Sequence, residues 1–487
     1  MTKGFISQCE QEALHRSGMI QPHGSLLICS ADLQVTHASG NIAEHTGREP
    51  HRWLGQKLPK ELASLDEMLS KEPGARTIVS RTLDDQHSLD VVVTRSQHGG
   101  LILELLPCLE EWVLDIPKPP ILPPPPASNE ELLSLRRALL AQIAKLTGAH
   151  RVMYYAFHPS EDGEVLDEIC DDTVAGTYLG LRYPASDIPM VARQLYLKNP
   201  WRSIPDAQAA PVPILSLNAD ALADLTWSDL RSVSPVHVIY LANMGVKAAL
   251  SFPVAVGGGL TALVSAHYQI PIILPPRLLD NLSQQVRNFA HALALWQSQQ
   301  RIRLIDGLNR RLEALQHVIR RHGDPISAWP ELAQGLIEEF DVDGATLCID
   351  QQHANAGSAL EPMPLAVLDD WFGEQSDEAV WCSDHLSGEV RAFPLSEIAG
   401  VMAVRIRRPG NRSIRIYLSR TEYIHDVSWG GNPHKPVEYH DGQLGIAPRR
   451  SFEKWVERRI GYSRPWSNEA RLLALRLRDV LQQGLVW

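Results

Sequence analysis

Short apolar runs separated by turn residues fill the first hundred positions of the chain. The runs SLLICSADLQVTHAS, LDVVVTR and GGLILELLP, all within residues 24–107, alternate apolar and polar positions as half-buried strands do. They predict a small α/β domain of the sensor type. The stretch DIPKPPILPPPPASNEE that follows predicts a linker, because proline fits the interior of neither a helix nor a sheet.

A second domain is predicted where the spacing of apolar residues changes from strand-like to helical, at Asn129. The segment NEELLSLRRALLAQIAKLTG carries apolar residues three and four positions apart and ends in Gly148, a favourable C-terminal cap. RVMYYAF and EVLDEI then predict strands, followed by an irregular segment around TYLGLRYPASDIP. The runs ALSFPVAV and LTALVSAHY, joined by glycines, predict a buried hairpin that closes this domain.

The remainder of the chain predicts a long helix and a third domain. From about Pro276 apolar positions recur at helical spacing, and no proline interrupts them before Pro325. A helical pattern much longer than about 25 residues is typical of a spine or a coiled coil. GATLCID, GVMAVRIRR and RSIRIYLSR predict strands of the third domain, about residues 325–465, and NEARLLALRLRDVLQQGLVW predicts a final helix.

Length and charge agree with this division and narrow the possible partners. At about 150 residues per domain, 487 residues correspond to roughly three domains. The chain has 46 basic and 57 acidic residues, a net charge of −11, which argues against nucleic acid or an anionic membrane as partner. Its six cysteines form no C-x-x-C pair, which excludes a disulfide scaffold and fits a reducing compartment. With no export signal visible, we expect a cytoplasmic protein.

Missing motifs exclude several classes of site. No phosphate-binding G-x-x-x-x-G-K-[ST] loop, H-E-x-x-H metal motif or G-x-S-x-G nucleophile elbow is present. The uncharged stretch 248–276 is long enough to span a bilayer, but Pro253 and the glycines at 257–259 would leave backbone groups unsatisfied in lipid. We therefore expect no nucleotide site, no metal site and no membrane span.

Four segments carry candidate chemistry, and two of them lie in the first half of the chain. Residues 9–24, CEQEALHRSGMIQPHG, place a lone cysteine in a polar arm, where it is either a reactive thiol or an incidental surface cysteine. In residues 183–196, YPASDIPMVARQLY, two prolines bracket ASDI and predict an irregular loop. Such a loop either directs main-chain carbonyls inward or is simply solvated. Arg193, Arg202 and Arg231 near this loop suit recognition of a carboxylate.

The other two segments contain a histidine-bearing helix and an aromatic excursion. In residues 231–251, RSVSPVHVIYLANMGVKAALS, His237, Tyr240 and Met244 share one helix face, although a buried core histidine is the simpler alternative. SWGGNPHKP and APRRSFEKWVE, within residues 428–457, predict a hairpin-like excursion. Its aromatic side chains should dock onto another part of the molecule, or the loop packs on its own domain.

Together the four segments resemble the photosensory core of bacterial phytochromes, or bacteriophytochromes. C-E-x-E…I-Q-P-H-G, Y-P-A-S-D-I-P, S-P-x-H…N-M-G-V and P-R-x-S-F occur here in the family's order, and the resemblance covers nearly the whole chain. It implies an α/β (α+β) fold of three sensor-type domains, PAS, GAF and PHY, with antiparallel sheets joined by a long helical spine. It also implies an N-terminal figure-of-eight knot, with Ile20 where the arm threads a GAF loop. The implied bounds are 1–112 for the arm and PAS domain, 113–128 for the proline-rich linker, 129–297 for the GAF bilin-binding domain, 298–324 for the helical spine and 325–487 for the PHY domain, with a tongue at about 423–460 and a C-terminal signalling helix.

The resemblance also implies a covalently bound linear tetrapyrrole. Cys9 matches the arm cysteine that forms a thioether with the vinyl group of ring A, whereas Val236 stands where plant and cyanobacterial relatives carry their attachment cysteine. Biliverdin is therefore the implied cofactor. The main-chain carbonyl of Asp187, which Ile188 follows, would accept from the pyrrole N–H groups, with His237 beside these nitrogens. His267 would lie near the ring D carbonyl, Arg202, Arg231, Tyr196 and Ser251 at the propionates, and Met153, Tyr155, Tyr183 and Tyr240 around ring D.

The implied function is a red/far-red photoreceptor module that photoconverts between two states and controls a downstream output, without a catalytic domain in this chain. Arg449 would reach back to Asp187 of the YPASDIP loop, and Ser451 is a further expected residue of the switch. The tongue would change between strand and helix on conversion, anchored by Trp429, Phe452 and Trp455. A homodimer through the helical spine and an output domain or response partner outside the chain are expected. Two alternatives stay open: a PAS–GAF module that senses another small ligand without photochemistry, and an enzyme such as a light-gated kinase fragment.

Overall fold

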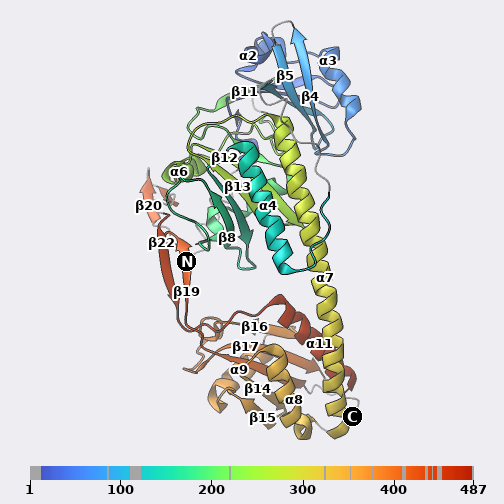
Figure 1. Ribbon diagram of the computed structural model, residues 1–487, viewed down its shortest axis with the longest axis vertical. Helices are drawn as coiled ribbons and strands as arrows, with labels where there is room; N and C mark the ends of the chain where they lie inside the picture. The colour runs from blue at the N-terminus through green and yellow to red at the C-terminus, as the bar shows by residue number, and fades with distance from the viewer. Residues whose placement is uncertain are drawn as a thin grey trace. The chain divides into compact units, whose positions relative to one another are not determined.

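A computed structural model describes most of the chain and divides it into two compact units. The first unit is Met1–Trp296 with Ser428–Trp455, and the second is Gln297–Val427 with Val456–Trp487. Each unit has its own hydrophobic core, and Figure 1 labels the helices and strands. The described residues are 13–84, 87–109, 122–218, 221–322, 325–350, 352–374, 378–407, 413–433, 437–440, 443–446 and 452–484.

The first sheet of the first unit runs in the order β1-β11-β3-β2-β6-β5-β4, and each neighbouring pair is antiparallel. The apolar runs predicted as strands within residues 24–107 are confirmed. Short helices pack Ile42 and Leu62 against this sheet. The strands are β1 (Met19–Ile20), β2 (Ser25–Cys29), β3 (Val35–Ser39), β4 (Arg76–Asp84), β5 (His87–Arg95), β6 (Leu101–Pro107) and β11 (Val212–Ser216). The helices are α2 (Ile42–Thr46), α3 (Lys60–Ala63) and the 3-10 turns Leu14–Arg16, Pro50–Arg52 and Ser64–Met68.

The second sheet of this unit runs in the order β10-β12-β13-β7-β8-β9-β19-β22. Its predicted hairpin is confirmed, because β12 and β13 pair antiparallel around a turn with Gly257 at φ 62° and Gly258 at φ 81°. A positive φ at both central positions is the reason that glycine stands there. The strands are β7 (Arg151–Phe157), β8 (Gly163–Cys170), β9 (Arg182–Tyr183), β10 (Arg202–Ile204), β12 (Ala248–Val256), β13 (Gly259–Tyr268), β19 (His425–Gly430) and β22 (Lys454–Arg459).

The excursion predicted within residues 428–457 joins this second sheet through β19 and β22, with a small hairpin of β20 (Val437–His440) and β21 (Gln443–Ile446) between them. Next to β22, Trp429 on β19 lies opposite Arg182 on β9, and this pairing is parallel. The expectation of purely antiparallel sheets is therefore wrong at this pair. Because β19 comes from a distant part of the chain, no tight turn dictates its direction.

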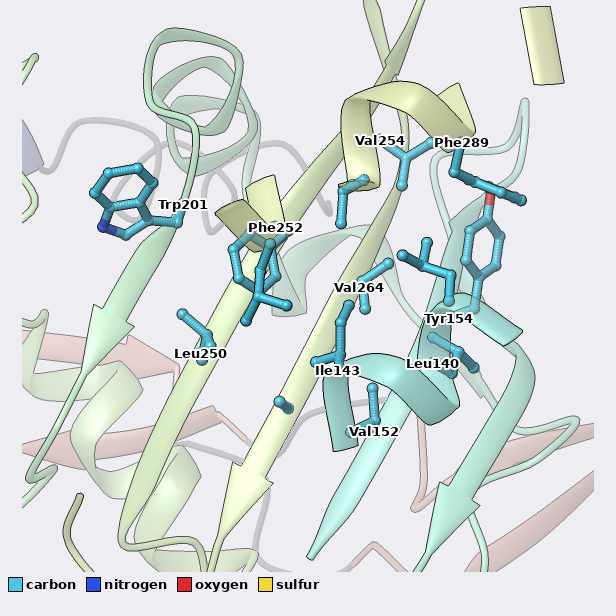
Figure 2. Close-up of a cluster of buried hydrophobic side chains, with 14 of the residues drawn as sticks. Leu140, Ile143, Val152, Tyr154, Trp201, Leu250, Phe252, Val254, Val264 and Phe289 are labelled. Atoms are coloured by element: carbon cyan, nitrogen blue, oxygen red, sulfur yellow. The ribbon is translucent and has the colours of Figure 1, made fainter. Parts of the chain in front are cut away.

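Helices α4 (Asn129–Thr147) and α7 (Pro276–His322) cover one face of the second sheet, as Figure 1 shows. The N-terminus of α4 is capped by Ser128, whose Oγ accepts from the Glu131 amide at 3.2 Å, and Gly148 ends the helix at φ 66°. The described helices include none that is both long and apolar enough to cross a membrane. Figure 2 shows the core of this layer, which includes Leu140, Ile143, Val152, Tyr154, Trp201, Leu250, Phe252, Val254, Val264 and Phe289.

The second unit contains a sheet in the order β15-β14-β18-β17-β16, in which each neighbouring pair is antiparallel. Helices α8 (Pro325–Phe340) and α11 (Asn468–Gly484) pack on one face and α9 (Pro362–Glu374) and α10 (Leu386–Glu389) on the other. Strand alternation separates the faces, since Ile416 and Leu418 join the first core and Tyr417 the second. The strands are β14 (Gly344–Ile349), β15 (Gln352–Gly357), β16 (Val380–Ser383), β17 (Ile398–Arg407) and β18 (Ser413–Thr421).

Candidate functional site

A cavity of about 230 Å³ lies on the face of the second sheet that α4 and α7 leave open. On β7, Met153 and Tyr155 line this cavity. Val152 and Tyr154, which alternate with them, fill the core on the other face. The remaining walls include α5 (Met190–Lys198), α6 (Pro235–Asn243), the irregular loop 183–189 and the segment 231–234. The same strands therefore supply the core with one set of side chains and the cavity with the other.

Every predicted cofactor-binding residue in the described part of the chain lines this cavity. Strands, helices and a loop that are distant in sequence converge there. Cys9, Arg449 and Ser451 lie outside the described residues. The predicted residues in the lining are Met153, Tyr155, Tyr183, Asp187, Ile188, Tyr196, Arg202, Arg231, His237, Tyr240, Ser251 and His267.

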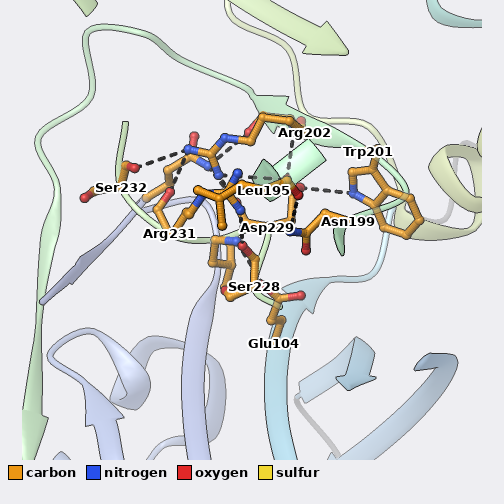
Figure 3. Close-up of polar contacts among 12 residues, drawn as sticks. Glu104, Leu195, Asn199, Trp201, Arg202, Ser228, Asp229, Arg231 and Ser232 are labelled. Carbon is orange, nitrogen blue, oxygen red and sulfur yellow. Dashed lines mark hydrogen bonds and ion pairs between the residues drawn. The ribbon is translucent and has the colours of Figure 1, made fainter. Parts of the chain in front are cut away.

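Two arginines, whose polar contacts Figure 3 shows, make one end of the cavity basic. Arg202 and Arg231 are each 7% exposed. Burial, followed by the charge of the neighbouring Arg202, lowers the pKa of Arg231 to about 9. Asp229 Oδ1 lies 3.9 Å from Arg202 Nη1, but burial raises the pKa of this carboxyl to about 6. Two buried cations beside such a weakened partner favour the binding of an anion such as a carboxylate.

Two histidines of the cavity are held neutral at pH 7. Burial, followed by the charge of a neighbouring arginine, lowers the pKa of His237 to about 4 and that of His267 to about 3. The His237 ring stacks with Tyr240 at a centroid distance of 6.1 Å, and the Tyr240 hydroxyl donates to Asp187 Oδ2 at 3.3 Å. His267 Nε2 lies 3.2 Å from Ser265 Oγ. A neutral imidazole has one donor and one acceptor, so each ring can pair with an N–H or a carbonyl of a ligand.

Aromatic side chains enclose another part of the cavity. The ring centroids of Tyr155 and Tyr183 are 5.9 Å apart, and those of Tyr178 and Tyr183 are 6.5 Å apart. Phe452, from the excursion, meets Tyr240 edge-on at 4.9 Å. Burial raises the pKa of Tyr155 well above its usual value, so its hydroxyl keeps its proton and can donate to a ligand. This wall suits a flat conjugated group with polar edges.

The excursion contacts the cavity wall closely, as predicted for its aromatic residues. Trp429 is 4% exposed, and Trp455 is half-buried on β22. A Cβ at Gly430 would lie 2.5 Å from the ring of Tyr183, so only glycine allows this approach of the two backbones. The structure thus gives β19 a docked position beside the loop that begins at Tyr183.

Arg193 does not belong to the cavity lining, and its expected role in carboxylate recognition is wrong. Its Nε donates to the carbonyl of Ile188 at 2.8 Å, and its Nη2 donates to the carbonyl of Glu161 at 2.6 Å. The guanidinium also lies over the ring of Phe157 at 4.3 Å. Because Arg193 lies outside the lining and its Nε and Nη2 donate to main-chain oxygens of Ile188 and Glu161, it stabilises the irregular loop, whereas Arg202 and Arg231 line the cavity.

Ser265 and Tyr178 are among the lining residues that are absent from the predicted set. Ser265 lies two positions before His267 on β13, so strand alternation alone indicates that it faces the cavity. Tyr178 is held by Glu168, whose carboxylate accepts from the Tyr178 amide at 3.1 Å. That contact joins a strand to an irregular segment, and no periodic pattern in the sequence predicts it.

The buried histidines predict that the ligand-free protein loses stability on mild acidification. Unfolded His237 binds a proton as the pH falls below about 6.5, but the folded protein resists until about pH 4. The unfolded state binds more protons in this window, so the free energy of unfolding falls as the pH falls. Between pH 7 and 5 we expect His237 to account for about 1–2 kcal/mol of that loss, and His237→Gln to remove it in urea unfolding. His98→Gln, in an exposed turn, should leave the pH dependence as it is, and an unchanged dependence in His237→Gln would contradict the burial of this ring.

Comparison with known proteins finds a family model for each end of the chain. A family model described as "Phytochrome region" matches residues 308–485, and one described as "PAS fold" matches residues 9–108. Cyanobacterial phytochrome B of Nostoc sp. and a bacteriophytochrome of Pseudomonas aeruginosa are each 32% identical to this chain over 98% of its length. The chain spans 66% of the length of each of these relatives.

Solved structures extend the similarity to the whole described fold. The photosensory core module of the Stigmatella aurantiaca phytochrome superposes with a TM-score of 0.80 at 30% identity, covering 98% of this chain and 97% of that one. A bacteriophytochrome from the photosynthetic bacterium R. palustris gives a TM-score of 0.77 at 25% identity, covering 99% of each chain. Phytochromes bind a bilin, a linear tetrapyrrole with two carboxylates, and the buried arginines and aromatic wall of the cavity fit such a group. On this evidence of sequence, fold and cavity, the chain belongs to the phytochrome family and corresponds to its photosensory core.

Proposed function

We propose that this chain is a red/far-red light photoreceptor module that binds biliverdin covalently and photoconverts between two states to control a downstream signalling output. The observation that carries the proposal is the one cavity whose lining contains all twelve described residues expected at the pigment. When bound, the bilin supplies the absorption of visible light and the rotation of its last ring. The protein supplies attachment, compensating charge, hydrogen bonds and space for that rotation.

Attachment at Cys9, with biliverdin as the pigment, is supported by the positions of the other cysteines. The five other cysteines all lie in the described part of the chain, and none of them lines the cavity. Val236, beside His237, does line it, so no thiol stands at the alternative attachment position. In this proposal a thiolate in the N-terminal arm is therefore the nucleophile, and biliverdin is the bilin that this arrangement suits.

The cavity residues have separate tasks in this proposal. Arg202 and Arg231 hold the two propionates, whose charge offsets the cost of burying the guanidinium groups. The main-chain carbonyl of Asp187 accepts from pyrrole N–H groups, and neutral His237 accepts directly or through water. His267 donates to the carbonyl of the last ring. Tyr196 and Ser251 add donors at the propionates, Ile188 packs on the ring plane, and Met153, Tyr155, Tyr183 and Tyr240 surround the ring that rotates.

The proposal also assigns a knot to the N-terminal arm and a dimer contact to the long helix α7. Ile20 is 0% exposed and pairs with Val212 on one side and with Arg231 on the other, which supports a figure-of-eight knot of the arm. Leu295 and Ile302 on α7 are 47% and 59% exposed, which supports a homodimer contact along the helical spine. We place the protein in the cytoplasm, with an output domain or response partner outside this chain.

Absorbance spectra test this function directly. The purified protein is incubated with biliverdin and measured in darkness, after red light and after far-red light. We expect a strong red band and a reversible shift to the far-red. A bound pigment whose spectrum light does not change would favour the non-photochemical small-ligand sensor instead. A protein that binds no biliverdin would overturn the proposal altogether.

A further inference from the structure

Glu104 links the first sheet to the basic end of the cavity. It lies on β6, is 2% exposed, and does not itself line the cavity. Its Oε1 accepts from the Ser228 hydroxyl at 2.6 Å and from the Leu230 amide at 2.8 Å. Hydrogen bonds to a carboxylate are stronger than those between neutral groups, especially where water is excluded. Glu104 therefore fixes the backbone of residues 228–230.

The same stretch of backbone orients both arginines of the cavity. Arg231 Nη1 donates to the carbonyl of Ser228 at 2.8 Å. Arg202 Nη1 donates to the carbonyl of Asp229, and its Nη2 donates to the carbonyl of Arg231 at 2.8 Å, as Figure 3 shows. The direction of each guanidinium thus depends on where the carbonyls of residues 228–231 point. Their direction depends in part on the two hydrogen bonds to Glu104.

The charged side chains around Arg202 come from different parts of the first unit. Asp229 belongs to the segment itself and accepts from the Ser203 amide at 2.9 Å and from the Trp201 indole at 3.1 Å. Burial lowers the pKa of Arg202, whereas Asp229, Tyr196 and Glu104 raise it. A carboxylate on the first sheet therefore helps to keep a buried guanidinium charged at the cavity of the second sheet.

We propose that Glu104 is a positioning residue for the pigment, which by fixing residues 228–231 aims Arg202 and Arg231 at the pigment's carboxylates. This inference rests on the proposed function, in which these two arginines hold the propionates. It gives the first sheet a part in pigment recognition although Glu104 contacts no pigment. The specific consequence is that Glu104 contributes to the binding of an acidic bilin and not to the binding of an uncharged one.

Two probes that differ only in their carboxylates test this consequence. Non-covalent affinity is measured by absorbance titration in a Cys9→Ser background, with biliverdin and with biliverdin dimethyl ester, whose carboxylates are capped. We expect Glu104→Ala to weaken biliverdin binding at least about tenfold and ester binding less than about twofold. Glu104→Gln keeps an accepting oxygen and should restore biliverdin affinity to within about threefold of wild type. An equal loss for both probes, or no loss for either, would overturn the positioning role.

Controls separate this inference from the proposed function. Asp90, on the neighbouring strand β5, is a matched buried carboxylate that is 4% exposed and accepts a hydrogen bond from the Ser80 hydroxyl. Asp90→Ala should change the affinity for biliverdin and for its dimethyl ester by less than about twofold. Ser228→Ala removes one donor to Glu104 and supplies the same comparison if Glu104→Ala does not fold. If the wild-type protein binds acid and ester equally, the arginine role within the proposed function fails. If the wild-type protein prefers the acid to the ester, but the Glu104 and Ser228 variants bind both probes as the wild type does, this inference fails and the proposed function stands.

Discussion

Cys9→Ser is expected to abolish covalent attachment of the pigment completely while leaving non-covalent binding in the cavity. None of the other cysteines, all of them in described residues, lines the cavity, so no second thiol can replace Cys9 without a rearrangement of the fold. The arginines, histidines and tyrosines that would hold the pigment are unchanged in this variant. Zinc-enhanced fluorescence of the protein band on a denaturing gel reports the covalent fraction, and a red absorbance band before denaturation reports the bound fraction.

Cys170→Ser is the matched control for attachment, because Cys170 is the exposed cysteine among those described. It should keep full zinc fluorescence. If Cys9→Ser retains the full amount of covalently bound pigment, Cys9 is not the attachment residue and the attachment site lies elsewhere. Loss of both covalent and non-covalent pigment would mean that the arm serves binding as well as attachment.

Arg449→Ala is expected to leave the first light-driven step intact and to shorten the lifetime of the final far-red-absorbing state by about tenfold to a hundredfold. The expectation comes from the match of P-R-x-S-F to the tongue motif, in which this arginine pairs with the Asp187 loop. A charge-assisted pair shielded by docked aromatic rings contributes about 1.5–3 kcal/mol, which shifts a two-state equilibrium by that factor. The docked neighbours are present here, since Phe452 meets Tyr240 at 4.9 Å and Tyr240 donates to Asp187.

Flash photolysis and infrared difference spectra in the amide region measure this effect. The adjacent Arg450→Ala carries the same loss of charge at a neighbouring position and is the control. We expect it to resemble wild type. If Arg449→Ala forms a far-red-absorbing state with wild-type yield, lifetime and amide change, Arg449 does not stabilise that state.

Much of the fold is predictable from the sequence because its elements follow local rules. The period of apolar residues predicts the two helices that cover the second sheet and the hairpin of β12 and β13. The cap residues Ser128 and Gly148 mark both ends of α4. Asp187 and His237 are predictable for a different reason, since they stand in two short motifs of the family, and the other cavity residues are expected from the wider resemblance to that family.

Contacts between remote segments could not be predicted in this way. The position of Arg193 near Arg202 and Arg231 in the sequence predicts anion binding. In the structure its Nε and Nη2 donate to two backbone carbonyls that only the folded loop brings near. The addition of β11 to the first sheet and the parallel pairing of β19 with β9 also depend on tertiary geometry. Glu104 belongs to none of the recognised motifs. Its proposed role follows from two hydrogen bonds that it accepts from the Ser228 hydroxyl and the Leu230 amide, more than a hundred residues later in the chain.

The alternation of core and cavity side chains along β7, β12 and β13 has a consequence for how this protein can change through mutation. On β12, Ala249 and Ser251 line the cavity while Leu250 and Phe252 fill the core. Substitutions at one set of positions leave the packing of the other set largely intact, because the side chains lie on opposite faces of one sheet. Spectral properties can therefore drift at cavity positions while selection for foldability acts on their immediate neighbours, and the two kinds of selection act independently within a single strand.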